Sequence, residues 1–160
     1  MRFLPAIRRG WRLWLGAAVS AAVLGSAAAW LAHPDRSGAG FVEYRMLQPL
    51  DSPTAIAAAP DGTIWFTIDL AAAIGRVRNG EIERLPLPRN NVEPIGLGVG
   101  PDGSAWYTDN SARAISRITP SGEISSFPLG TPIVRLGRMA VSPEGAVWFA
   151  EATAYSITRL

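Results

Sequence analysis

Two carboxylates occupy the same place in successive copies of a repeated segment. Asp109 and Glu151 each stand three residues after a tryptophan, and an earlier copy has Ile68 at this place, followed by Asp69. A hard cation such as Mg²⁺ is bound by one or two carboxylates together with water molecules. Asp109 and Glu151 could therefore help to hold a hard cation of this kind, with water completing its ligands. The alternative is that both are loop acids, either solvated or hydrogen-bonded to nearby backbone amides.

Side chains that transfer protons or act as nucleophiles are scarce. The one histidine, His33, lies outside the repeated part, and the 160 residues include no cysteine. The lack of cysteine excludes disulfides, thiolate metal sites and cysteine nucleophiles. Arg135 and Arg138 lead into the third repeat and could meet an anionic ligand, with solvated loop positions as the alternative. We therefore predict no catalytic residue in this chain.

The charge distribution argues against nucleic-acid binding. The formal net charge is +2 and the isoelectric point is about 9.7. Four arginines lie within the first twelve residues, however, and from Phe41 onward ten arginines stand against twelve acidic residues. Since no basic stripe remains in the repeated part, we predict no nucleic-acid partner.

The elements that would position these side chains follow from the repeat itself. Trp65, Trp106 and Trp148 sit in similar nine-residue blocks and are separated by 41 and 42 residues. A period of about 40–50 residues is typical of one four-stranded blade of a β-propeller. The sequence therefore predicts an all-β fold with about three blades, in which each tryptophan fills the space between neighbouring sheets.

The second repeat predicts one blade strand by strand. The expected strands are 95–99, 104–108, 114–118 and 123–127, because the segments between them are polar or rich in turn residues. Pro101-Asp102-Gly103 predicts a tight turn, since Asp can bond its own backbone and Gly accepts a positive φ. Residues 41–47 are predicted as one isolated fourth strand, which brings the expected total to twelve strands.

The motifs of these repeats resemble those of the virginiamycin B lyase (streptogramin lyase) family. The resemblance covers residues 40–160 and rests on four segments, which are Pro94-Ile95-Gly96-Leu97, Gly100-Pro101-Asp102-Gly103, Trp106-Tyr107-Thr108-Asp109 and Ser125-Ser126-Phe127-Pro128-Leu129. It implies a seven-bladed propeller and a Mg²⁺-dependent lyase that opens cyclic streptogramin B depsipeptides by elimination at the ester linkage, without water.

The same resemblance bears on the site residues. It places Asp109 and Glu151 at an acidic position of the family motif, on the propeller face that carries ligands. It also implies a catalytic histidine, for which the repeats have no counterpart. We therefore expect this chain to be inactive in the elimination. The alternatives are a non-catalytic propeller that binds a small cyclic peptide, another ligand or a protein, and a degenerate fragment without activity.

The first forty residues predict export from the cytoplasm. A basic segment precedes Leu13–Ala32, which contains twenty residues without a charge. This pattern predicts an apolar helix over residues 1–32 that is either a cleaved signal peptide or a retained membrane anchor. Residues 33–40 read as a linker rich in Gly, Pro and Ser. Both alternatives place the propeller repeats, residues 41–160, outside the cytoplasm, because the arginines stay inside.

Three blades are fewer than the usual range for a propeller, which is about 4–8. We expect either that the sequence is the N-terminal part of a longer protein or that copies of the chain associate to complete a ring. In both cases the outermost sheet faces need a covering, because large exposed apolar patches are uncommon on soluble monomers.

Overall fold

The computed structural model describes residues 40–69, 71–130 and 135–160. A compact unit runs from Tyr44 to Leu160, and its described residues contain eleven strands and no helix. The predicted N-terminal helix and nearly all of the predicted linker lie outside the described residues. Within the described part, no helix is long and apolar enough to cross a membrane.

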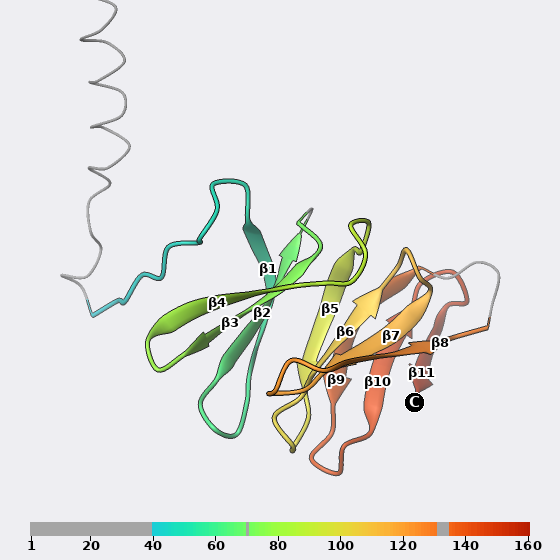
Figure 1. The fold of residues 1–160 in the computed structure, drawn as a ribbon. Helices are drawn as coiled ribbons and strands as arrows, with labels where there is room; N and C mark the ends of the chain where they lie inside the picture. Colours follow the sequence, from blue (N-terminus) through green and yellow to red (C-terminus); the bar gives the residue numbers. More distant parts are fainter. Residues whose placement is uncertain (1–39, 70, 131–134) are drawn as a thin grey trace, which may run out of the picture. The chain divides into compact units, whose positions relative to one another are not determined.

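The strands form three antiparallel sheets, each in simple up-and-down order (Figure 1). The first sheet contains β1 (Ser52–Ala58), β2 (Ile64–Asp69), β3 (Ala73–Arg78) and β4 (Glu81–Pro86). The second contains β5 (Pro94–Val99), β6 (Ala105–Asp109), β7 (Ala114–Ile118) and β8 (Ile124–Pro128). The third contains β9 (Leu136–Val141), β10 (Val147–Glu151) and β11 (Ser156–Arg159).

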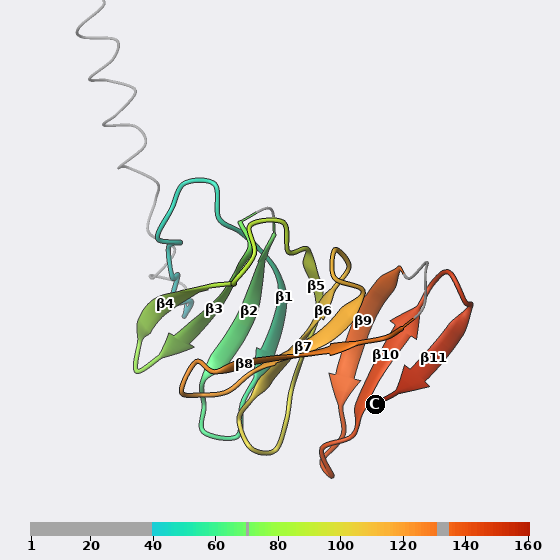
Figure 2. The same ribbon diagram turned by 45° about the vertical axis from the view of Figure 1, so that its right-hand side comes forward.

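The second sheet lies between the other two, as Figure 2 shows. Its first strand, β5, contacts β1 and β2 on one side and β9 on the other. One buried cluster joins the first two sheets and includes Trp65, Ile74, Leu97 and Tyr107. The predicted all-β fold is therefore confirmed, and the side-by-side antiparallel sheets agree with a partial propeller.

The strand boundaries follow the sequence pattern closely. Each strand of the second sheet lies within one residue of its predicted position at both ends. The turn before β6 forms as expected: Gly103 has a φ of 79°, and the amide of Ser104 donates to Asp102 Oδ1 at 3.1 Å. Since glycine accepts this left-handed backbone without strain, the Pro-Asp-Gly segment fixes where one strand ends and the next begins.

Two expectations need correction. Residues 41–47 form no strand; Met46 instead packs beside the cluster of Phe66 and Ile68 on the first sheet. A fourth strand needs an edge to pair with, and the strand ladders of the three described sheets do not include this segment. Trp65 is 1% exposed, as expected, but Trp148 is 43% exposed, because no described sheet lies beyond the third one to cover it.

Candidate functional site

The acidic position of the second repeat is buried and already has partners. Asp109 ends β6 and is 2% exposed. Its Oδ1 accepts a hydrogen bond from the amide of Ala112 at 2.9 Å, and its Oδ2 forms an ion pair with Arg89 Nη2. Arg89 belongs to the segment between β4 and β5, and sequence reasoning missed it as a partner because the two residues are twenty positions apart.

The other predicted site residues lie in the equivalent region of the third sheet. Glu151 ends β10 and is partly exposed, and its backbone pairs with Leu136 in the strand ladder. The amide of Arg135 donates to Thr153 Oγ1 at 2.9 Å, which ties the entry of β9 to the loop after β10. Both Arg135 and Arg138 are exposed, consistent with either of their predicted roles.

These positions offer Mg²⁺ no ready set of ligands. No group of three or more His, Cys, Asp or Glu side chains gathers in residues 40–69, 71–130 and 135–160. The carboxylate of Asp109 holds an arginine and an amide, so a cation would have to displace a partner from a buried group. The geometry at Asp109 agrees with the alternative of a loop acid bonded to backbone, and the Mg²⁺ assignment of Asp109 and Glu151 stays a prediction.

Asn110 is the residue that sequence reasoning overlooked in this region. Its Oδ1 accepts from the amide of Leu136 at 2.7 Å, and its Nδ2 donates to the carbonyl of Leu136 at 3.1 Å. The side-chain amide thus pairs with β9 as a strand residue would, and it joins the loop after β6 to the third sheet. A polar residue in a turn gives no sequence signal for such a bond, because its partner lies 26 residues away.

At the other end of these strands, the turn before β6 contains a charged side chain, Asp102, whose contacts stabilise the turn. The side chain of Asp102 is about half exposed, and the limited desolvation of its carboxylate by itself raises its pKa. Hydrogen bonds from the amide and hydroxyl of Ser104, together with the Arg117 guanidinium, outweigh this desolvation and lower the pKa below its ordinary value. Asp102 therefore stays ionised at neutral pH and acts as a turn and ion-pair residue.

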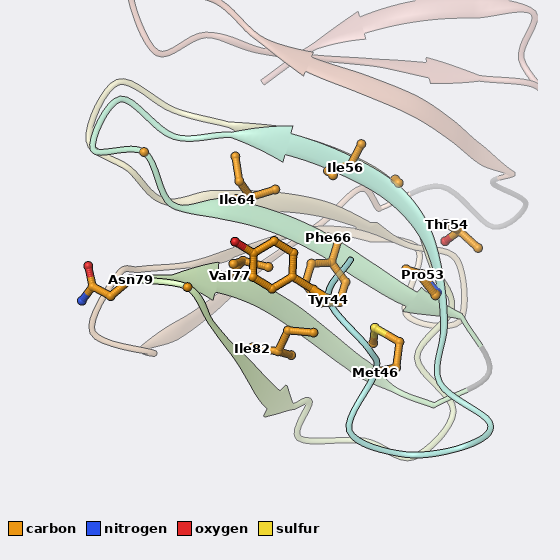
Figure 3. Close-up of a pocket in the computed structure, with 13 residues that line it drawn as sticks. Tyr44, Met46, Pro53, Thr54, Ile56, Ile64, Phe66, Val77, Asn79 and Ile82 are labelled. Carbon is orange, nitrogen blue, oxygen red and sulfur yellow. The ribbon is translucent and has the colours of Figure 1, made fainter. Parts of the chain in front are cut away.

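A hollow of about 670 Å³ lies on the outer face of the first sheet (Figure 3). Apolar side chains of the sheet form its floor, and two residues of the segment before β1 lie over it. The main lining residues are Tyr44, Met46, Ile56, Phe66, Val77 and Ile82. Its wall contains neither Asp109 nor Glu151, so the apolar hollow and the predicted acids are separate features.

The family assignment comes from the whole repeated region. The sequence model of the virginiamycin B lyase family matches residues 35–160, which is well over half of the chain. The chain belongs to the virginiamycin B lyase family. The resemblance carried by the repeated motifs is thereby confirmed.

Relatives of known structure agree with this assignment. A catalytically inactive histidine-to-alanine variant of virginiamycin B lyase from Staphylococcus aureus, solved with quinupristin, is 33% identical with a TM-score of 0.67. The match covers 74% of this chain and 41% of that chain. A streptogramin B lyase structure is 30% identical with a TM-score of 0.65, over 76% of this chain and 44% of that one.

A curated relative gives the same family over a shorter stretch. The virginiamycin B lyase of Bordetella pertussis is 38% identical over 53 residues, which is 32% of this chain and 18% of that protein. The chain therefore matches less than half the length of each of these virginiamycin B lyase relatives. Over the matched parts it shares the fold of the two solved relatives, with TM-scores of 0.67 and 0.65.

Proposed function

We propose that residues 44–160 are consecutive blades of a virginiamycin B lyase-like propeller, and that this chain alone does not eliminate streptogramin B. The observation that carries the proposal is a family repeat without a histidine, since His33 is the sole histidine of the sequence and precedes the repeats. The inactive relative from Staphylococcus aureus, in which alanine replaces a histidine, supports a need for that side chain.

The chemistry explains why the missing group matters. Elimination at an ester needs a base that removes a proton next to a carbonyl, a cation or donor that stabilises the enolate, and an acid for the leaving group. Asp109 is engaged with Arg89 and a backbone amide, and Asp102 is engaged with Ser104 and Arg117. These carboxylates serve the fold, and neither is placed as a free base.

The test is incubation of the purified full chain with quinupristin and Mg²⁺. An elimination product is an isomer of its substrate, whereas hydrolysis adds the mass of one water molecule. Chromatography followed by fragmentation mass spectrometry therefore separates the ring-opened isomer, the hydrolysed product and the intact ring. We expect only the intact ring, as in a control without protein, and formation of the ring-opened isomer by the pure chain would overturn the proposal.

A second candidate, a non-catalytic binding module outside the cytoplasm, is favoured by the apolar hollow on the first sheet. Isothermal titration with quinupristin distinguishes the candidates, because binding without ring opening is the behaviour of a module that has kept a ligand surface.

The ring of seven blades implied by the family resemblance needs four more blades than the three sheets that the structure describes. We propose that the remaining blades come either from further chain or from further copies of this chain.

A further inference from the structure

The turn between β3 and β4 consists of the dipeptide Asn79-Gly80. Arg78 and Glu81 pair with each other at the ends of the two strands, so the two residues between them form the whole turn. The φ angle is 53° for Asn79 and 82° for Gly80. A positive φ at both central residues is characteristic of the type I′ hairpin turn, for which Asn-Gly is a preferred pair. Both residues are exposed, so the turn presents the asparagine side chain and the next backbone amide to water.

An asparagine that precedes a glycine can react with its own backbone. The amide nitrogen of the glycine attacks Cγ of the asparagine; a bond forms between these two atoms, the bond from Cγ to the side-chain nitrogen breaks, and ammonia leaves. Water then opens the cyclic succinimide at either of its carbonyl groups. The products are aspartate and isoaspartate, and water is the sole co-reactant because no atom is oxidised or reduced.

The amide of Gly80 is placed to act as this nucleophile. In the part of the chain that the structure describes, the hydrogen bonds of the turns include none that this amide donates. The corresponding turn of the second sheet differs, because the amide of Gly122 donates to the carbonyl of Thr119 at 2.9 Å. A β-carbon on Gly80 would meet nothing within 4 Å, so the succinimide ring has room to form.

The other three asparagines of the sequence are less suited to the reaction. Asn110 is held at both ends of its side-chain amide: Oδ1 accepts from the amide of Leu136 at 2.7 Å, and Nδ2 donates to the carbonyl of Leu136 at 3.1 Å. Both bonds must break before this side chain can turn towards its own backbone. Asn90 and Asn91 are exposed, but asparagine and valine follow them, and these side chains crowd the attacking nitrogen.

We propose that Asn79 is a site of spontaneous deamidation, at which ring closure onto the Gly80 amide converts the asparagine to aspartate or isoaspartate. The reaction uses only the turn and water, so the proposal is independent of the lyase chemistry. Either product adds one negative charge to the turn at neutral pH. The modification is therefore a slow, one-way change of charge at one end of the first sheet.

The two products differ in what they do to the hairpin. Aspartate tolerates the left-handed backbone as asparagine does, so this product keeps the turn. Isoaspartate carries the main chain through its side chain and lengthens the turn by one carbon atom. The pairing of Arg78 with Glu81 closes over a turn of only two residues, so the longer turn should disturb the end of this strand ladder.

The turn also forms part of the wall of the hollow on the first sheet. Asn79 and Gly80 line the hollow at the end of the hairpin, beyond Val77 and Ile82 (Figure 3). Deamidation would place a carboxylate in this wall, beside a floor of apolar side chains. The polarity of the hollow would then change with the age of the chain, without any change in the gene.

Peptide mapping of the ageing full chain tests the proposal. The chain is incubated at neutral and at mildly alkaline pH, and mass spectrometry follows the conversion of Asn79 and Asn110 with time. We expect Asn79 to react at least about tenfold faster than Asn110, because two hydrogen bonds must break at Asn110 first. The rate should rise with pH, since the attacking nitrogen must lose its proton. Equal rates at the two asparagines would overturn the proposal.

The same measurement in urea separates the sequence from the fold. Asn110 should react faster in urea than in the folded chain, because unfolding removes its hydrogen bonds to Leu136. Asn79 should react in the folded chain as well as in urea. If Asn79 stays intact in the folded chain and reacts only in urea, the turn protects it and the proposal is wrong.

Asn79→Ser is the matched variant, because the second repeat has Ser121-Gly122 at this place. Isoelectric focusing should show an acidic species that accumulates in the natural chain and is absent from the variant, while both keep the circular dichroism spectrum of a β-protein. Enzymatic methylation of isoaspartate should label the aged natural chain alone. Equal accumulation of the acidic species in both chains would place the new charge elsewhere and overturn the assignment to Asn79.

Discussion

At the residue scale, the contact that recurs most clearly is a cation–π stack of an arginine on each repeated tryptophan. Arg76, Arg117 and Arg159 lie 5.3, 5.8 and 5.8 Å from the ring centres of the tryptophans on their neighbouring strands. Each stack lies on the sheet face that meets, or would meet, the next sheet. Cation–π contacts of this kind contribute about 0.5–2 kcal/mol, with the larger values where water is excluded.

Arg76 makes the most contacts of the three. Its side chain is 8% exposed, and its Nε donates to Glu83 Oε2 at 2.7 Å. Its Nη1 donates to the carbonyl of Pro120 in the second sheet at 2.6 Å, so that one guanidinium links two sheets. We expect Arg76→Met to lower the free energy of unfolding by about 2 kcal/mol, because it leaves the partly buried acceptors Glu83 Oε2 and the Pro120 carbonyl without their charged donor.

Urea denaturation of the full chain measures this loss, and Arg78→Met is the matched control. Arg78 lies on the same strand, is 43% exposed and reaches Glu83 only at 3.6 Å. A partly exposed arginine with one long ion pair should contribute no more than about 0.5 kcal/mol. Equal losses for the two variants would show that the bond to the second sheet adds nothing to stability.

At the element scale, the close approach of β5 to β9 sets the spacing between the second and third sheets. A β-carbon on Gly96 would lie 2.5 Å from the carbonyl oxygen of Gly137 and 3.2 Å from the amide nitrogen of Met139. These are backbone atoms, so they cannot turn aside as a side chain can. Gly96→Ala should therefore push β9 away and lower the free energy of unfolding by about 1–3 kcal/mol.

The facing strand offers the control for this substitution. A β-carbon on Gly137 would meet the side chain of Ala150 at 3.5 Å, which is an ordinary contact. Gly137→Ala should be neutral or slightly stabilising, since alanine reduces the freedom of the unfolded chain. Thermal unfolding followed by circular dichroism compares the two variants, and the interpretation fails if Gly96→Ala is tolerated as well as Gly137→Ala.

Strands could be predicted from the sequence where residues close to one another in the chain determine where each strand begins and ends. The Pro-Asp-Gly turns and the tryptophan period locate β5 to β8, because turn residues and alternation act over a few neighbours. The strand expected over residues 41–47 is absent, because strand formation also needs an edge elsewhere. In the same way, the pairing of Asp109 with Arg89 and of Asn110 with Leu136 depends on loops that meet only in the folded chain.

At the scale of the whole molecule, we expect local stability to be highest in the middle sheet and lower in the outer sheets. The second sheet has neighbours on both faces, and the strand β7 is buried at four of its five residues. The third sheet has a neighbour on one face, and β11 has no fully buried residue. In arrays of stacked units, each unit is stabilised mainly by its nearest neighbours, so the outer units open first.

Amide hydrogen exchange of the dilute full chain tests this gradient peptide by peptide. We expect the amides of β7 to exchange only through global unfolding, so that their opening free energy approaches that of the whole unit, and the amides of β11 to exchange through local opening. Ile157→Asp is the control, since it changes an exposed side chain and should leave β7 unaffected. Equal protection of β7 and β11 at high dilution would show that the three sheets open as one unit. It would contradict the expectation that each sheet is stabilised mainly by the sheets next to it.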